Sequence, residues 1–149
     1  MKIRRATLPD IPFLVNQLRA FHATLPFANV EFPENSYVEE NVKALIENHL
    51  MLLAESEDGN GLGFIAGILN RNLLNPRVLV LSELFWWVKP EARALGTGVS
   101  LLTQFLEYGK LLPGVKIITV SLEKNSPVSD NTLIELGLSP AERTFIMEL

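Results

Sequence analysis

The sequence has no cysteine and only two histidines among its 149 residues. The lack of cysteine excludes disulfides, thiolate metal sites and a cysteine nucleophile, and it is compatible with a reducing compartment. His22 and His49 stand far apart, and neither has acidic residues at the spacing of metal ligands. We therefore expect no metal site, and any catalysis must use other chemistry.

The sequence also lacks a basic cluster, a signal-peptide pattern and an apolar run of about 18 residues. Its 13 Lys and Arg residues are scattered, and 17 Asp and Glu residues bring the net charge to -4. Binding to nucleic-acid phosphates needs clustered cationic side chains, so we expect no direct nucleic-acid partner. These absences predict a cytoplasmic protein without a membrane partner.

The length and the composition predict one globular domain spanning residues 1–149. Hydrophobic residues make up 48% of the chain and charged residues 20%, which is the globular range. We find no internal repeat, low-complexity segment or linker. The chain is long enough to bury one sizeable core and too short for two ordinary domains.

The periodicity of the apolar residues predicts an α/β protein. Thr7 and Asp10 form a capping-box-like start for the first helix, which should end near His22. The segment 77–88 should form a central strand, because it is rich in β-formers and stops before Pro90. The expected strands are 2–6, a strand running into a turn within 49–60, 61–70, 77–88, 115–122 and 143–149. The expected helices are 7–22, 36–46, 96–110 and 128–136.

A candidate anion site lies between the strand at 77–88 and the helix that follows it. The residues of this turn are Arg93, Ala94, Leu95, Gly96, Thr97 and Gly98. Unpaired N–H groups and the positive end of the helix dipole favour phosphate at a helix N-terminus, and glycine lets the main chain approach it closely. The alternative is an ordinary strand-to-helix turn, for which a Gly-x-Gly would be unremarkable.

This turn resembles the pyrophosphate-binding signature of the GNAT N-acetyltransferases, in which Gln or Arg is followed by two residues, Gly, one residue, and Gly or Ala. Arg93, Gly96 and Gly98 match the signature. The preceding Val88-Lys89-Pro90 and the following Leu101-Leu102 also stand where the family places them. The opening IRRATLPDI and the closing LIELGLSPAERTFIMEL extend the resemblance over nearly the whole chain, and ELFWWVKPEAR is most similar to phage-encoded members.

The resemblance implies a GNAT fold, with a central mixed β-sheet splayed between strands four and five and flanked by helices. It implies acetyl-CoA as co-substrate and direct transfer of the acetyl group to a small-molecule or peptide amine, without a covalent enzyme intermediate. The pantetheine arm would meet the main chain at Trp86, Trp87 and Val88, and Asn125 would contact coenzyme A. A homodimer is common in similar proteins and is therefore one expected assembly.

Two positions depart from the family pattern. Ala94 replaces a common glycine, which matters only if the backbone there needs a positive φ. Leu133 replaces the tyrosine that usually acts as general acid, so the group that protonates the departing thiolate is open.

Glu83 and Ser126 are the candidate catalytic residues. Glu83 interrupts an apolar strand, and it would accept the ammonium proton directly or through a water. It shares a face with Phe85 and Trp87 unless a bulge shifts the register, and it could equally be an acid at the exposed start of the strand. Ser126 is the alternative residue for handling the proton, although capping of the last helix would explain Asn125 and Ser126 as well.

The sequence therefore predicts an acetyl-CoA-dependent N-acetyltransferase and leaves two other functions open. The first is a catalytically weak acyl-CoA-binding or regulatory module, which Leu133 favours. The second is a structural or partner-binding domain in which the turn at 93–98 binds no cofactor. The amine acceptor follows from no motif, because residues 23–37 and the first two helices would shape its site.

Overall fold

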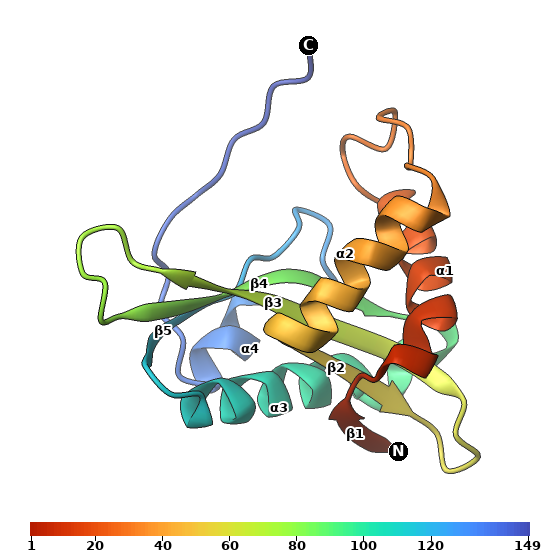
Figure 1. Cartoon of the computed structure of the whole chain (residues 1–149), viewed down its shortest axis with the longest axis horizontal. Coiled ribbons are helices and arrows are strands. Elements are labelled where there is room, and N and C mark those ends of the chain that lie inside the picture. The colour runs from red at the N-terminus through yellow and green to blue at the C-terminus, as the bar shows by residue number, and fades with distance from the viewer.

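The computed structural model describes residues 1–149 and shows a five-stranded sheet with helices on both of its faces (Figure 1). The strands lie in chain order, β1-β2-β3-β4-β5. The elements are β1 (Lys2–Arg5), a 3-10 turn η1 (Leu8–Asp10), α1 (Ile11–His22), α2 (Asn35–Asn48), β2 (Leu50–Glu55), β3 (Gly61–Arg71), β4 (Leu79–Val88), a 3-10 turn η2 (Pro90–Leu95), α3 (Thr97–Leu111), β5 (Val115–Thr119) and α4 (Asp130–Glu135).

The sheet is mixed, as predicted. Strands β1 to β4 pair with one another in antiparallel order. Strand β5 pairs with β4 in parallel after the crossover through α3. The β4–β5 ladder runs only from Leu79 opposite Val115 to Ser82 opposite Thr119, and the rest of β4 has no partner on that side. The two strands therefore separate beyond Ser82, which is the expected splay.

Two apolar clusters hold the helices to the two faces of the sheet. The first contains side chains of α1 and α2, including Leu14 and Val42, together with Phe64 and Trp87 from the sheet. The second contains Leu101 and Phe105 of α3 together with Leu81 and Val88 of β4. Because neighbouring residues of a strand point to opposite faces, Trp87 lies in the first cluster and Trp86 packs against the second.

A β-bulge interrupts β4 at Leu84. Phe85 stands opposite Ala66 of β3 and Glu83 stands opposite Gly67, so Leu84 is an extra residue without a partner. Leu81 belongs to the cluster under α3, whereas Phe85 packs on the side of α1 and α2. A side chain at Gly67 would collide with Phe105 of α3, so its partner Glu83 faces the same side as α3. Glu83 therefore does not share a face with Phe85 and Trp87.

The C-terminal strand predicted for residues 143–149 is wrong. Gly137 ends α4 with a φ of +92°, and Leu138 still packs against the core below α3. Residues 139–149 then extend away from the rest of the molecule without regular structure (Figure 1). Their alternating apolar pattern favours a strand, but a strand forms only where its backbone groups find partners, and this segment has none within the chain.

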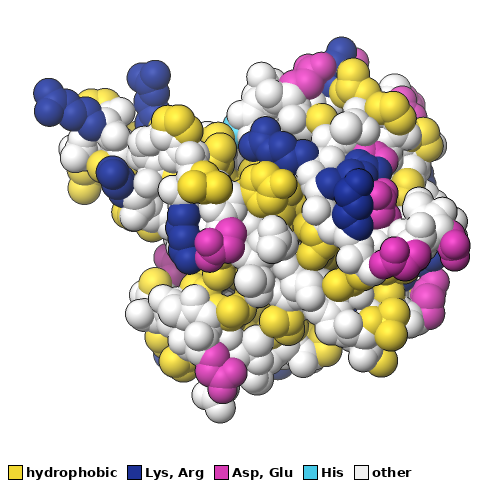
Figure 2. All heavy atoms as spheres, turned by 90° about the horizontal axis from the view of Figure 1, so that it is seen from below, with side chains coloured by type: hydrophobic (Ala, Val, Ile, Leu, Met, Phe, Trp, Pro, Cys, Tyr) yellow, Lys and Arg dark blue, Asp and Glu magenta, His cyan; other side chains and the backbone are white.

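Charged side chains of both signs are interspersed over much of the face seen in Figure 2. The projection at the left of that view is the hairpin between β3 and β4, which carries basic and hydrophobic side chains. Leu73 and Leu74 at its tip are fully or almost fully exposed. None of the helices combines the length and the apolar character needed to cross a membrane.

Candidate functional site

The turn after β4 has the shape of a cradle, formed by residues 93–98. Pro90 opens the 3-10 turn, and the buried Ala92 fixes that turn against the core. Gly96 then adopts a left-handed conformation with a φ of +72°, which favours glycine, and α3 begins at the next residue. A methyl group added at Gly96 would have no atom within 4 Å. The cradle is therefore open to solvent at the point where the chain enters the helix.

The first turn of α3 presents three backbone N–H groups that precede the first hydrogen bond of the helix. The first hydrogen bond of the helix runs from Ser100 N to Gly96 O over 3.1 Å, so the N–H groups of Thr97, Gly98 and Val99 precede it. The 15-residue helix adds the positive end of its dipole at this place. The arrangement favours an anion with several oxygens, such as a phosphate group.

Thr97 provides a second, independent polar group at the same place. Its side chain is fully buried, and its Oγ1 is the one buried side-chain oxygen or nitrogen in the chain without a hydrogen-bond partner. An unsatisfied buried hydroxyl costs free energy unless something bonds to it. The protein itself thus leaves the Thr97 hydroxyl unsatisfied at the start of α3.

Arg93 lies against the end of β4 in this structure. Its Nε donates a hydrogen bond of 3.0 Å to Val88 O, and its guanidinium carbon lies 4.8 Å from the centre of the Trp87 ring. Trp87 Nε1 in turn donates to Gln17 Oε1 of α1 over 3.0 Å. These contacts connect the cradle to the first helix. The positive charge of Arg93 stays beside the turn, where it adds to the attraction for an anion.

Glu83 lies where β4 and β5 separate. Its Oε2 accepts a hydrogen bond of 3.2 Å from Ser121 N, just beyond β5. Burial raises the pKa of Glu83 to about 7, with a smaller contribution from the nearby Glu123 charge, while the Ser121 hydrogen bond acts in the opposite direction. A carboxyl group with this pKa can accept and release a proton near neutral pH.

Several residues predicted from the sequence meet in this region. A methyl group at Gly98 would lie 3.6 Å from the Trp86 ring, an ordinary contact, so Trp86 and Gly98 are neighbours. Val88 is held by Arg93, and Leu95 is exposed at the mouth of the cradle. Ala94 needs no positive φ, because only glycines have one in this chain. The replacement of the usual glycine at position 94 therefore causes no backbone strain.

Other predicted residues lie farther along the chain, in the segment between β5 and α4. Asn125 is exposed, and Ser126 Oγ accepts a hydrogen bond from Val128 N over 3.1 Å. Neither residue caps α4, because Ser129 has that role through a bond from Thr132 N. Leu133 packs against the core under α3, where it has no group that could donate a proton.

Sequence reasoning missed Gln17 and Ser121 as neighbours of the site. Gln17 lies on the same helix as the buried Leu14 and Leu18 but is a polar residue off their stripe, which is a weak signal for a contact with the sheet. Ser121 contributes through its backbone N–H, which no side-chain pattern reports. Only the parallel pairing of β5 with β4 brings it to Glu83.

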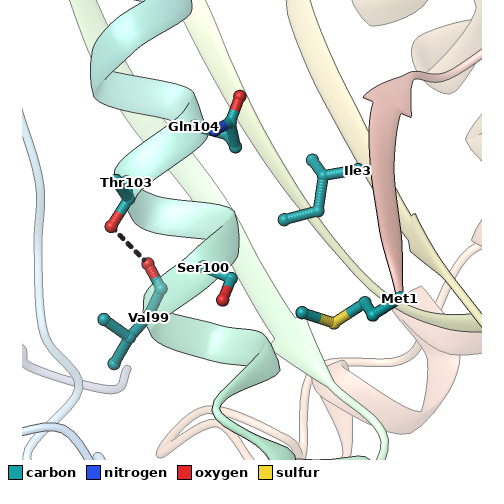
Figure 3. Close-up of a pocket in the computed structure, with 6 residues that line it drawn as sticks. All are labelled: Met1, Ile3, Val99, Ser100, Thr103 and Gln104. Atoms are coloured by element: carbon teal, nitrogen blue, oxygen red, sulfur yellow. Dashed lines mark hydrogen bonds between the residues drawn. The ribbon is translucent and has the colours of Figure 1, made fainter.

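A separate groove of about 450 Å³ lies on the other side of α3 (Figure 3). It runs between Met1 and Ile3 at β1 and the first turns of α3, whose lining residues include Ser100 and Gln104. The strand order puts β1 and β5 at opposite edges of the sheet. The groove is therefore on the β1 side of α3, and the opening between β4 and β5 is on the other.

Comparison with known proteins rests on the fold, since no protein-family model and no curated protein sequence matches the chain. Solved structures match over nearly its whole length. A possible acetyltransferase from Clostridium difficile 630 has a TM-score of 0.74 at 12% identity, covering 99% of this chain and 96% of its own. An aminoglycoside acetyltransferase from an uncultured soil metagenomic sample has a TM-score of 0.72 at 16% identity, covering 99% and 94%.

The chain has the GNAT fold. The curled mixed sheet and the parallel β4–β5 pair belong to that fold. A protein from Bacillus halodurans C-125 described as a transcriptional regulator also matches, with a TM-score of 0.75 at 21% identity over 99% of each chain. Proteins with different descriptions thus resemble this chain about equally in fold, and its activity has to be argued from the site.

Proposed function

We propose that the chain is an N-acetyltransferase that moves an acetyl group from acetyl-CoA to an amine by direct attack. One observation carries the proposal: the anion cradle at the start of α3 adjoins the end of β4, the strand whose splay from β5 leaves Glu83 at the opening. A donor with a pyrophosphate and an extended arm fits such a cradle followed by a gap between strands.

The residues of the cradle fit the pyrophosphate of coenzyme A. The N–H groups of the first turn of α3 and the Thr97 hydroxyl, which has no protein partner, supply donors, and the left-handed Gly96 supplies room for oxygen atoms. The part of β4 beyond Ser82 has no strand partner on the β5 side. Its main-chain groups at Trp86 to Val88 that bond neither β3 nor Arg93 can therefore bond an extended amide-bearing arm. Acetyl-CoA would supply the activated thioester.

The first chemical requirement is a base that removes a proton from the acceptor amine. An amine near neutral pH is mostly an ammonium ion, whose nitrogen has no free electron pair. We assign Glu83 to remove that proton, directly or through a water, because its pKa of about 7 leaves much of it ionised at neutral pH while making it a better base than an exposed carboxylate. The freed nitrogen forms a bond to the thioester carbon as the carbon–sulfur bond breaks, and it loses its second proton as the amide forms, which balances the proton that the sulfur takes up.

The departing sulfur must receive a proton in its turn. Leu133 cannot give one, which leaves solvent or Ser126. Ser126 Oγ accepts a bond from Val128 N, so its own O–H proton remains available for donation. We assign Ser126 this supporting role, and exchange of Ser126 for alanine should then slow thiol release without weakening acetyl-CoA binding.

The test combines binding with turnover. A ligand at a hundredfold excess over its dissociation constant adds about 2.7 kcal/mol of stability, which is roughly 5 to 10 °C in melting temperature for a domain of this size. Acetyl-CoA should produce that rise, while NAD and ATP at the same concentration should not. A screen of amine classes for release of free thiol then identifies the acceptor. A melting curve unaffected by saturating acetyl-CoA would refute the proposal.

A second candidate function is a catalytically weak acyl-CoA-binding or regulatory module. The packing of Leu133 against the core favours it, because this chain has no phenol where the family usually has one. Stabilisation by acetyl-CoA without thiol release from any amine class would favour this module over the enzyme.

A further inference from the structure

The hairpin between β3 and β4 displays two neighbouring leucines at its tip. Leu73 is 100% exposed and Leu74 is 96% exposed. The hairpin stands out from the body of the molecule, and Figure 2 shows basic and hydrophobic side chains on this projection. Two adjacent leucines left wholly in water forgo the stabilisation that burial would give them, and such apolar patches mark contact surfaces. The tip is therefore a candidate contact surface.

The loop that carries these leucines is closed by its own hydrogen bonds. Asn72 Oδ1 accepts from Leu74 N over 2.8 Å and from Asn75 N over 3.1 Å. Asn75 Oδ1 accepts from Arg77 N over 3.1 Å, and Asn72 N donates to Val78 O over 2.9 Å across the neck of the hairpin. These bonds fix the loop without using either leucine side chain, which leaves both side chains for a partner.

The hairpin belongs to a basic end of an otherwise acidic molecule. Its segment 71–79 lies beside segment 110–117, because Leu79 N donates to Gly114 O over 2.9 Å and β4 pairs with the start of β5. The other nine of the 13 Lys and Arg residues share the rest of the chain with all 17 Asp and Glu residues. A partner of this end should therefore carry negative charge. The two segments contain no acidic residue and four basic ones, Arg71, Arg77, Lys110 and Lys116.

Three of these four charges are available to a partner. Lys110 bonds Glu107, whereas Arg71, Arg77 and Lys116 are exposed and take part in none of the ion pairs of the molecule. The two arginines stand on either side of the leucines, where the chain enters and leaves the tip, and Lys116 lies farther back on β5. The apolar side chains thus lead, and the cations follow one level behind them.

This order matches the layers of an anionic membrane surface. Headgroup anions would meet the cations, while the leucines reach the apolar boundary just below the headgroups. Nucleic acid offers phosphates to the cations but mainly polar base edges to the leucines. A convex apolar tip enters lipid without a preformed pocket, whereas an acidic protein would need a matching cavity to receive it. The observations therefore favour lipid as the occupant.

We propose that the β3–β4 hairpin docks the chain on an anionic lipid surface. Leu73 and Leu74 enter the boundary between headgroups and acyl chains, and Arg71 and Arg77 bind the headgroup anions with their aliphatic stems against the lipid. Such docking needs no apolar run long enough to span a bilayer. The prediction of no membrane partner rests on the lack of such a run, and it does not test docking at the surface.

Docking through the hairpin leaves the candidate site in solution. Strand β4 leads from Leu79 beside the hairpin to Val88 beside the cradle, and its ten residues separate the two by roughly 30 Å. Two leucines and three cations support weak, reversible docking, comparable to that of a single acyl chain with an affinity of about 10⁴ M⁻¹. Half of the protein should therefore be bound at about 0.1 to 1 mM accessible lipid.

Sedimentation of the full chain with lipid vesicles tests the docking. The chain should sediment with vesicles of phosphatidylserine and phosphatidylcholine and not with phosphatidylcholine alone, and added salt should weaken the binding. Leu74→Ser should lower the vesicle affinity at least tenfold, because a buried leucine is lost from the contact. Arg77→Gln should lower it about fivefold, the contribution of one basic residue near an anionic surface.

Two exposed residues away from the hairpin provide matched controls. Val30 between α1 and α2 is 61% exposed, and Lys43 on α2 is exposed without an ion pair. Val30→Ser and Lys43→Gln should bind vesicles as the wild type does. All four variants should keep the melting temperature of the wild type, because none of the substituted side chains is buried. The hairpin variants should also keep the full stabilisation by acetyl-CoA, which separates this test from that of the proposed function.

The absence of cysteine allows insertion of the tip to be measured directly. Leu73→Cys and Val30→Cys are each labelled with a fluorophore whose emission depends on polarity. Mixed vesicles should shift the emission to shorter wavelength for the label at position 73 and leave it unchanged at position 30.

Several results would overturn the proposal. The first is a chain that stays in solution at about 10 mM mixed lipid, and the second is equal vesicle binding by the wild type and Leu74→Ser. Tighter binding to duplex DNA than to vesicles, lost in Arg77→Gln but kept in Leu74→Ser, would assign the basic end to nucleic acid. A dimer in light scattering that Leu74→Ser dissociates would assign the tip to a second copy of the chain.

Discussion

Arg93 lies over the ring of Trp87 and donates a hydrogen bond to the carbonyl of Val88. The same arginine is the first residue of the cradle, so one side chain connects the anion site to the end of the central strand. The Trp87 ring beneath it also contacts Phe21 of α1, with ring centres 6.0 Å apart. The position of the cradle therefore depends on packing that reaches the first helix.

Replacement of Arg93 by methionine should weaken acetyl-CoA binding more than it weakens the fold. Methionine keeps much of the apolar contact with Trp87 but loses the cation–π interaction and the bond to Val88 O, which together are worth about 1 to 2 kcal/mol. We expect a modest drop in melting temperature and at least a tenfold rise in the dissociation constant for acetyl-CoA, measured by titration calorimetry.

Arg19→Met is the matched control for that variant. Arg19 makes the same kind of contact elsewhere, 4.4 Å from the centre of the Phe32 ring, and also bonds Asn35. It should lose similar stability without any change in acetyl-CoA affinity. Equal affinity losses in both variants would mean that the effect of Arg93 is only a general loss of stability.

Comparison of Gly96→Ala with Gly59→Ala should separate the effect of backbone strain on stability from the effect of the added methyl group on acetyl-CoA binding. Gly96 and Gly59 have φ angles of +72° and +79°, and an added methyl group has no protein atom within 4 Å at either position. Alanine should therefore cost each fold about 1 to 2 kcal/mol. Only the change at Gly96 should also weaken acetyl-CoA binding, because only there does the methyl group project into the cradle. Equal binding by the two variants in calorimetry would place the pyrophosphate elsewhere.

Glu83→Gln should lower kcat/KM by about a hundred- to ten-thousandfold, because glutamine cannot accept the ammonium proton. Acetyl-CoA binding should survive. In the wild type, activity should rise as the pH passes through about 7, where Glu83 ionises. Glu123→Gln should move that rise to lower pH, since the Glu123 charge helps to keep the pKa of Glu83 high. Superimposable pH profiles for wild type and Glu83→Gln would remove Glu83 from the mechanism.

The Glu83→Gln variant should also be more stable than the wild type at high pH. The folded state raises the pKa of Glu83 from 4.5 to about 7, so between these values the folded chain holds a proton that the unfolded chain has lost. Stability contributed by this proton is present below pH 4.5 and is lost as the pH rises through 7. Melting curves from pH 4 to 9 should show Glu83→Gln gaining on the wild type by about 1 to 3 kcal/mol. A constant difference across this range would contradict the raised pKa.

Most elements could be predicted because their local patterns agree with the tertiary packing. The stripe of Leu14, Val15 and Leu18 predicted α1, and these three residues are indeed its buried face. The expected stop before Pro90 likewise coincides with the end of β4 at Val88, and the glycine-containing turn at 58–61 and Gly114 lie next to the starts of β3 and β5. In these cases the glycine or proline that determines the backbone conformation is visible in the sequence itself.

The features that escaped prediction depend on contacts between distant segments. Asp10 was expected to cap the first helix, and its carboxylate does accept from Thr7 N. It also receives two hydrogen bonds from Arg4, which holds the pKa of Asp10 down to about 2, and Arg4 bonds Glu55 of β2 as well. The spacing of Arg4, Asp10 and Glu55 in the sequence does not predict this cluster, because β1 and β2 come together only in the folded sheet.

The candidate site shows the same division. The cradle from Arg93 to Gly98 is continuous in sequence, so a motif could locate it, and its geometry agrees with that expectation. The surroundings of Glu83 depend on the bulge and on β5, and the sequence left the face of Glu83 open. The C-terminal strand was expected from alternation alone, which describes how a segment could pair but not whether a partner is present.

The extra residue in β4 is one that the strand could lose without changing where its other side chains point. Leu84 is 41% exposed and has no partner in the β3 ladder. Glu83 and Phe85 already point to opposite faces, as consecutive residues of a strand do, and they pair with the consecutive residues Gly67 and Ala66. Deleting Leu84 should therefore remove the bulge and leave Trp86 and Trp87 in their own clusters.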